Sequence, residues 1–172
     1  MSPAFNKFIK TKKFLLCVDS DGCAMDTMEI KHRKCFAPEM IKTWELFQDE
    51  DIITKMWLKI NLYSATRGIN RFKGLVKTFQ LMKENGVSTP EFEGIASWAE
   101  SARELSNQAL EDAGENGDNS LKKALEWSEA VNSSITVLPD TAKPFDNVKN
   151  VLEQASRVAD IAVVSSANLS AV

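Results

Sequence analysis

The chain has 172 residues, of which 44% are apolar and 26% are charged, and its formal net charge is −3. This composition is typical of a globular protein and excludes collagen-like, low-complexity and disulfide-scaffold proteins. The nearly balanced charge gives no general attraction to nucleic acid, and no apolar run approaches the ~20 residues of a membrane-spanning helix. We therefore expect neither a nucleic-acid partner nor a membrane partner.

Histidine and cysteine content narrows the possible metal sites. His32 is the only histidine, which excludes a site built from several histidines. Cys17, Cys23 and Cys35 are odd in number and lack the paired spacing of a zinc site. The apolar run after the N-terminal lysines is too short for a signal peptide. We expect reduced thiols in a cytoplasmic protein.

An apolar run at residues 14–18 predicts a short buried strand, which ends in a polar turn over residues 19–26. About residues 30–132 then carry apolar side chains at helical spacing and predict a helical bundle. Its helices are expected to begin near Pro38, Asp49 or Asp51, Phe72, Thr89 with Pro90, and residue 120. Its core is expected to contain Trp44, Trp57, Trp98 and Trp127.

The C-terminal part predicts a helix followed by a strand. Pro144 stands where a proline can open a helix, and apolar residues at helical spacing extend that helix to Arg157. An apolar run from Ile161 to Val164 predicts the strand, which Ser165 closes. A helix that leads directly into a strand is half of an α/β unit.

Two strands separated by a long helical insertion indicate the organisation of the chain. We expect the strands at 14–18 and 161–165 to be adjacent and parallel, in a helix-dominated α/β fold. Residues 1–26 and 138–172 would form an incomplete core, and residues 27–137 an all-helical cap inserted after the first strand. An insertion at that point suits a lid over a site at the carboxyl end of the strand.

The turn after the first strand holds the main candidates for chemistry. Asp19 and Asp21 are two residues apart, so both carboxylates can face one pocket if the segment is extended. One could act as a nucleophile and the other as a proton donor, and Mg²⁺ would relieve their repulsion. The alternative is an ordinary turn, since Asp and Gly are common turn residues. Ser165 likewise is either a ligand for a phosphoryl oxygen or only the end of a strand.

Together these segments resemble the haloacid dehalogenase superfamily. Residues 14–22, FLLCVDSDG, are similar to its first motif, an apolar strand ending in Asp-x-Asp-Gly, and Asp26 falls where many members have a further Asp. Residues 161–165, IAVVS, are similar to its second motif. The helical insertion between the motifs occupies the position of a C1-type cap. The resemblance implies a partial Rossmann-like core with this cap inserted.

The resemblance also implies a Mg²⁺-dependent phosphatase that acts on a small phosphorylated metabolite. Asp19 would take up the phosphoryl group, and Asp21 would protonate the leaving group and then activate water. Asp19 and the carbonyl of Asp21 would bind Mg²⁺, while Ser165 and Gly22 would bind the phosphate. The alternatives are a phosphomutase of the same superfamily and a non-catalytic helical interaction module on a degenerate core.

The superfamily has a third motif with a lysine and a fourth with an acidic pair, both after the second motif. The chain ends at Val172, so we expect a truncated form that is inactive or weakly active. The outer edges of its two strands would be bare, and bare strand edges recruit partners. Self-association through these edges is therefore a further expectation.

Basic side chains in the insertion are additional candidates. Arg67 and Arg71 stand four residues apart near a helix start, where they could share a face and bind an anionic substrate from the cap. The alternative is a solvated basic turn. His32 could contact the substrate, although an ordinary hydrogen bond at the base of the cap is the simpler interpretation.

Overall fold

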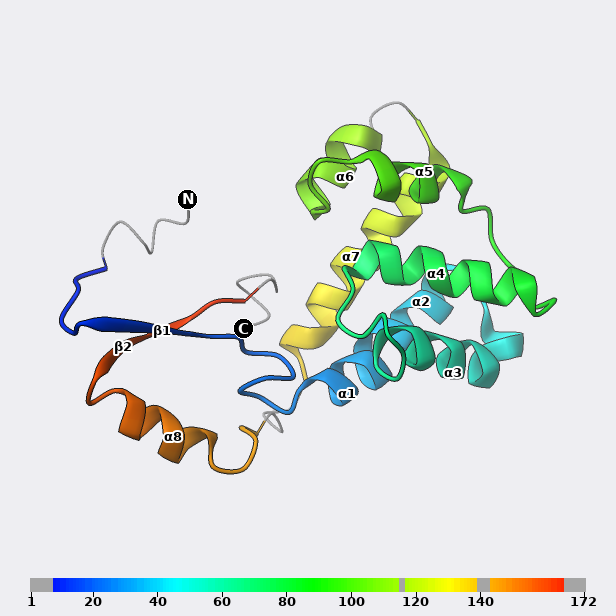
Figure 1. Cartoon of the computed structure of the whole chain (residues 1–172). Helices are drawn as coiled ribbons and strands as arrows, with labels where there is room; N and C mark the ends of the chain where they lie inside the picture. Colours follow the sequence, from blue (N-terminus) through cyan, green and yellow to red (C-terminus); the bar gives the residue numbers. More distant parts are fainter. Residues whose placement is uncertain (1–7, 115–116, 139–142, 166–172) are drawn as a thin grey trace. The chain divides into compact units, whose positions relative to one another are not determined.

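The computed structural model describes residues 8–114, 117–138 and 143–165. The chain divides into two compact units (Figure 1): unit 1 comprises Met1–Thr27 and Pro139–Val172, and unit 2 comprises Met28–Leu138. The helix-dominated α/β composition predicted from the sequence is confirmed. None of the helices in the described ranges has the length and apolar character needed to cross a membrane.

Unit 1 is built on two parallel strands, β1 (Phe14–Val18) and β2 (Ala159–Val163). The ladder pairs the first residue of each strand and continues in register to the last. The prediction of two adjacent parallel strands is therefore confirmed. Strand β2 begins at Ala159 rather than at Ile161, because the pairing with β1 already starts there.

Helix α8 (Val148–Ala155) precedes β2 and is shorter than the predicted helix. Pro144 lies outside it, in an isolated antiparallel bridge with Met25. The amide of Asp26 donates to the carbonyl of Lys143 at 2.8 Å, and the amide of Phe145 donates to the carbonyl of Ala24 at 3.1 Å. Neither bond needs an N–H from Pro144, so its missing N–H costs nothing there. The prediction that Pro144 opens the helix is therefore wrong.

The described part of unit 1 buries few side chains. Of its residues, Ser20, Thr27 and Ala159 are buried, and α8 has no buried residue. Phe14 of β1 is 59% exposed and Val163 of β2 is 64% exposed. Strand β1 contains no buried residue, because β2 is its one partner in the described sheet, so the prediction of a buried strand at residues 14–18 is wrong.

Unit 2 is helical. Its α-helices are α1 (Met28–Lys31), α2 (Ala37–Thr43), α3 (Glu50–Asn61), α4 (Arg71–Glu84), α5 (Glu93–Ser101), α6 (Asn107–Gly114) and α7 (Asn119–Thr136), with a π-helical turn at His32–Phe36 and a 3₁₀ turn at Phe47–Asp49. Helical backbone begins at Met28, well before the predicted start at Pro38. A proline removes an N–H and crowds the carbonyl four residues earlier. The π-helical turn directly before α2 accommodates this defect, so the helical segment continues through Pro38.

Trp127 of α7 lies at the centre of the core of unit 2. It is fully buried, and its ring contacts Phe36, Trp44, Trp57 and Phe72 at centroid distances of 5.7–6.3 Å. Its indole Nε1 donates a hydrogen bond of 3.2 Å to the carbonyl of Phe36. Large aromatic side chains contribute most of the buried area in such a core. Their burial explains why helices far apart in the sequence assemble here.

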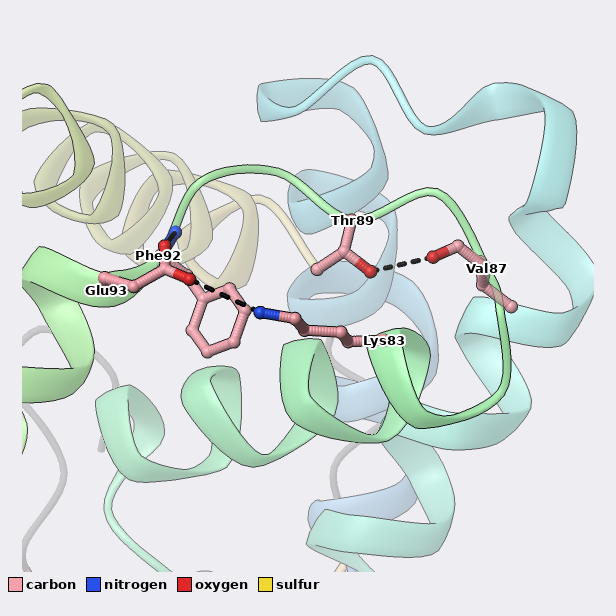
Figure 2. Close-up of polar contacts among 5 residues, drawn as sticks. All are labelled: Lys83, Val87, Thr89, Phe92 and Glu93. Atoms are coloured by element: carbon pink, nitrogen blue, oxygen red, sulfur yellow. Dashed lines mark hydrogen bonds and ion pairs between the residues drawn. The ribbon is translucent and has the colours of Figure 1, made fainter.

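The connection between α4 and α5 differs from its prediction (Figure 2). Thr89 was expected to cap a helix with Pro90 in its first position, but α5 begins at Glu93. The hydroxyl of Thr89 instead donates to the carbonyl of Val87 at 2.8 Å. Phe92 is buried against Phe79 of α4 at a centroid distance of 5.7 Å, and Glu93 forms a surface ion pair of 3.6 Å with Lys83, so the residues just before and at the start of α5 contact α4.

Candidate functional site

Unit 1 brings the acidic turn and Ser165 to the same edge of its sheet. Strands β1 and β2 are parallel, so their carboxyl ends meet at one edge. The pairing extends one step past β2, because the amide of Val164 donates to the carbonyl of Val18 at 2.9 Å. Asp19 follows β1 directly, and Ser165 follows Val164. The register therefore sets both segments at one end of the strand pair.

The turn after β1 is held by its own backbone. Ser20 is buried, and its carbonyl accepts hydrogen bonds from the amides of Ala24 and Met25 at 3.0 and 2.9 Å. Gly22 has a φ of 73°, in the left-handed region that favours glycine, and its amide donates to the carbonyl of Met25 at 2.8 Å. The turn itself thus explains Gly22, and phosphate binding by this residue stays a prediction.

The two aspartates of the turn have different surroundings. Asp19 is exposed, and its Oδ1 accepts a hydrogen bond of 2.9 Å from the amide of Ser20. Asp21 is partly buried, and its Oδ1 accepts a short hydrogen bond from the hydroxyl of buried Thr27. Sequence reasoning missed Thr27, because a hydroxyl six residues away carries no periodic signal. An open carboxylate beside an oriented one suits a division into nucleophile and proton donor.

The acidic turn provides the type of donor that Mg²⁺ prefers. Carboxylate and carbonyl oxygens are hard ligands, and protein Mg²⁺ sites often use one or two carboxylates, with waters and phosphate oxygens completing the shell. Asp19 and Asp21 fit that description. Within residues 8–114, 117–138 and 143–165, no group of three or more His, Cys, Asp or Glu side chains is arranged to hold a metal ion.

The two arginines of the insertion are not equivalent. Helix α4 begins at Arg71, so Arg67 lies in the turn before it, and the prediction that they share a helix face is wrong. Arg67 is exposed, and its Nη1 donates a long hydrogen bond of 3.3 Å to the carbonyl of Leu62. Arg71 is partly buried and donates to Ser128 and Asn132 of α7. Anion binding by either arginine stays a prediction.

His32 belongs to the core of unit 2. It is buried, its Nδ1 accepts a hydrogen bond of 3.0 Å from Trp57 Nε1, and its ring stacks on Phe36 at a centroid distance of 4.6 Å. Because Nδ1 accepts a hydrogen bond, a neutral ring carries its proton on Nε2. This environment favours the simpler interpretation of His32, an ordinary hydrogen bond.

Comparisons with known proteins do not assign the chain to a family. No family model, no curated protein and no solved structure matches the chain. The functional interpretation therefore rests on the residues and contacts described above.

Proposed function

We propose that the chain carries the phosphoryl-transfer site of a haloacid dehalogenase-type phosphatase, which cleaves a small phosphorylated metabolite. One observation carries this proposal: an Asp-x-Asp-Gly turn directly follows β1, at the sheet edge where Ser165 follows β2. Ligands of open α/β sheets bind at the carboxyl ends of the strands. The exposed carboxylate of Asp19 supplies the nucleophile. The carboxyl group of Asp21, which accepts a hydrogen bond from the Thr27 hydroxyl, supplies the proton donor.

In the proposed reaction, a carboxylate oxygen of Asp19 attacks phosphorus while the bond to the leaving oxygen breaks, and an aspartyl phosphate forms. Asp21 gives its proton to the leaving oxygen. Its carboxylate then accepts a proton from the attacking water, which releases phosphate and restores Asp19. Thr27 is a positioning residue, because its hydroxyl donates to one oxygen of Asp21 and so orients the carboxyl group.

The remaining groups of the proposed site bind the phosphate and the cofactor. Ser165 donates its hydroxyl to a phosphoryl oxygen, and Gly22 binds the phosphate from the turn after β1. Asp19 and the carbonyl of Asp21 would hold Mg²⁺, the proposed cofactor. When bound, the cation neutralises charge on the phosphoryl oxygens, which is the main requirement of phosphoryl transfer.

Beryllofluoride binding tests this proposal without requiring turnover, because the ion mimics a phosphoryl group attached to an aspartate. With Mg²⁺ present, we expect the full chain to give a protein-bound fluorine signal in ¹⁹F NMR. Asp19→Asn should abolish the signal, since the carboxylate oxygen that bonds beryllium is lost. Asp26→Asn makes the same charge change at an exposed position of the same segment and should keep the signal.

Two outcomes would contradict the proposal. One is a bound signal that persists in Asp19→Asn. The other is a folded chain that binds no beryllofluoride at any Mg²⁺ concentration, and this result would favour the non-catalytic interaction module.

A further inference from the structure

We propose that unit 2 contains an anion-binding site at Arg71, in which the Nε–Nη2 edge of the guanidinium binds a carboxylate or phosphate group of a small ligand. Every contact that defines this site lies within unit 2. The site therefore does not depend on the chemistry proposed for the acidic turn of unit 1.

One side of the guanidinium is fixed by α7. Nη1 of Arg71 donates to Asn132 Oδ1 at 2.7 Å, to Ser128 Oγ at 3.1 Å and to the carbonyl of Ser128 at 3.3 Å. Ser128 is fully buried, and its hydroxyl donates to Asn107 Oδ1 at 2.6 Å. The guanidinium carbon also lies 5.2 Å from the ring centroid of Phe36, within range of a cation–π contact. Helix α7 and one aromatic ring thus hold the group in place, and Asn107 of α6 fixes Ser128 in turn.

The opposite edge of the guanidinium carries its remaining N–H groups. Among the described residues, no acceptor takes a hydrogen bond from Nε or Nη2 of Arg71. No described side chain buries a nitrogen or oxygen that lacks a partner, so neither of these two nitrogens is fully buried. Nε and Nη2 present two parallel N–H groups, which match two oxygens of a carboxylate or phosphate.

The charge of Arg71 is not balanced inside unit 2. In the described ranges it forms no ion pair with an aspartate or glutamate. Burial lowers the pKa of Arg71, and no neighbouring carboxylate acts against this effect. A guanidinium nevertheless keeps its proton in proteins. A partly desolvated positive charge without a counter-ion is unfavourable, and a bound anion would offset that cost.

Arg67 provides the contrast within the same segment. It is exposed and holds one long hydrogen bond to a backbone carbonyl, so water solvates its charge and its orientation is only weakly fixed. An anion would have to order this side chain on binding. Arg67 therefore serves as the internal control for non-specific attraction of anions.

The test follows the arginine Nε–H signals of the ¹⁵N-labelled full chain by NMR. The chain is titrated with inorganic phosphate and, separately, with acetate, at constant ionic strength and without Mg²⁺. The Arg71 signal is assigned by its loss in Arg71→Lys. We expect this signal to shift and saturate with at least one of the two anions, while the Arg67 signal shifts without saturating.

The two probes also distinguish the ligands. Saturation by phosphate alone identifies a phosphoryl ligand, saturation by acetate alone a carboxylate, and saturation by both a site for either group. Saturation by neither anion, or equal behaviour of Arg67 and Arg71, would overturn the proposal.

A second variant keeps Arg71 and places a negative charge beside it. Asn132→Asp places a carboxylate where the amide now lies 2.7 Å from Nη1, so it supplies an internal counter-ion. We expect it to weaken anion binding at Arg71 about tenfold or more. Ser133→Asp adds the same charge at the exposed neighbouring position of α7 and should leave the affinity nearly unchanged. Equal affinities of the two variants would contradict the site.

Discussion

The hydrogen bond between Trp57 and His32 shows how one pair of buried polar atoms constrains unit 2. Trp57 is fully buried, and its indole donates to Nδ1 of His32 at 3.0 Å. Trp44 packs in the same core, at 5.1 Å from Phe79, but its indole donates to no described residue. The two tryptophans therefore separate the effect of the hydrogen bond from the effect of packing.

Trp57→Phe should lower the free energy of unfolding by about 1–3 kcal/mol more than Trp44→Phe does. Both substitutions remove a similar volume, but only the first leaves a buried acceptor, Nδ1 of His32, without its donor. Urea unfolding of the two variants measures the difference. Equal losses would show that the indole N–H adds nothing to stability.

At the scale of elements, Asp118 caps α7 and connects it to α5. Its Oδ1 accepts hydrogen bonds from the amide and hydroxyl of Ser120 at 2.8 and 2.7 Å. The Ser120 hydroxyl in turn accepts a hydrogen bond from the amide of Ile95 at 3.0 Å. The hydrogen bond from the Ser120 hydroxyl is the largest cause of the lowered pKa of Asp118, and the amides of Ser120 and Leu121 lower this pKa further. The ionised carboxylate is thus favoured in the folded state.

This cap predicts a defined dependence of stability on pH. Because the folded pKa of Asp118 is lowered, its contribution is present above the ordinary value of 3.8 and is lost as the pH falls through the folded value. Asp118→Ala should lower the free energy of unfolding by about 1 kcal/mol near neutral pH, and the loss should shrink in acid. Denaturant unfolding at several pH values measures both effects.

Asp118→Asn is the matched control, because its side-chain oxygen still accepts from the helix but does not titrate in this range. We expect it to lose less stability than Asp118→Ala near neutral pH. A loss in Asp118→Ala that stays constant into acid would contradict the role of the charged form.

At the scale of the whole molecule, the two units differ in how much apolar surface they bury. Unit 2 contains the largest fully buried side chains, among them Trp57, Trp127 and Phe79. In unit 1 the described strands each have one partner, and Phe14 and Val163 are mostly exposed. Strand edges without partners are sites where further strands add.

Sedimentation of the full chain and of the fragment 28–138 should therefore give different results. We expect the fragment to be a folded monomer, because its helices bury their apolar faces against one another. The full chain should self-associate with increasing concentration, through the strands of unit 1. A full chain that stays monomeric, or a fragment that associates equally, would contradict this prediction.

Elements with local signals could be predicted from the sequence. A run of five apolar residues before Asp19 predicted β1, and the run before Ser165 predicted β2 as its parallel neighbour. Apolar residues at helical spacing predicted the helices of unit 2, because one face of a helix must be buried whatever covers it. The turn after β1 was likewise predicted, since Asp and Gly are common turn residues, while its chemistry stays a prediction.

Other features depend on contacts that form only when the chain folds. Pro144 pairs with Met25 instead of opening a helix, and the partners of Arg71 lie more than fifty positions away on α7. Thr27 orients Asp21 through a turn that no periodic pattern reveals. The hydrogen bonds beside Pro144 and those of Arg71 join groups far apart in the sequence, and at about 1 kcal/mol each they can outweigh a local preference of similar size. Such bonds exist only once the chain has folded.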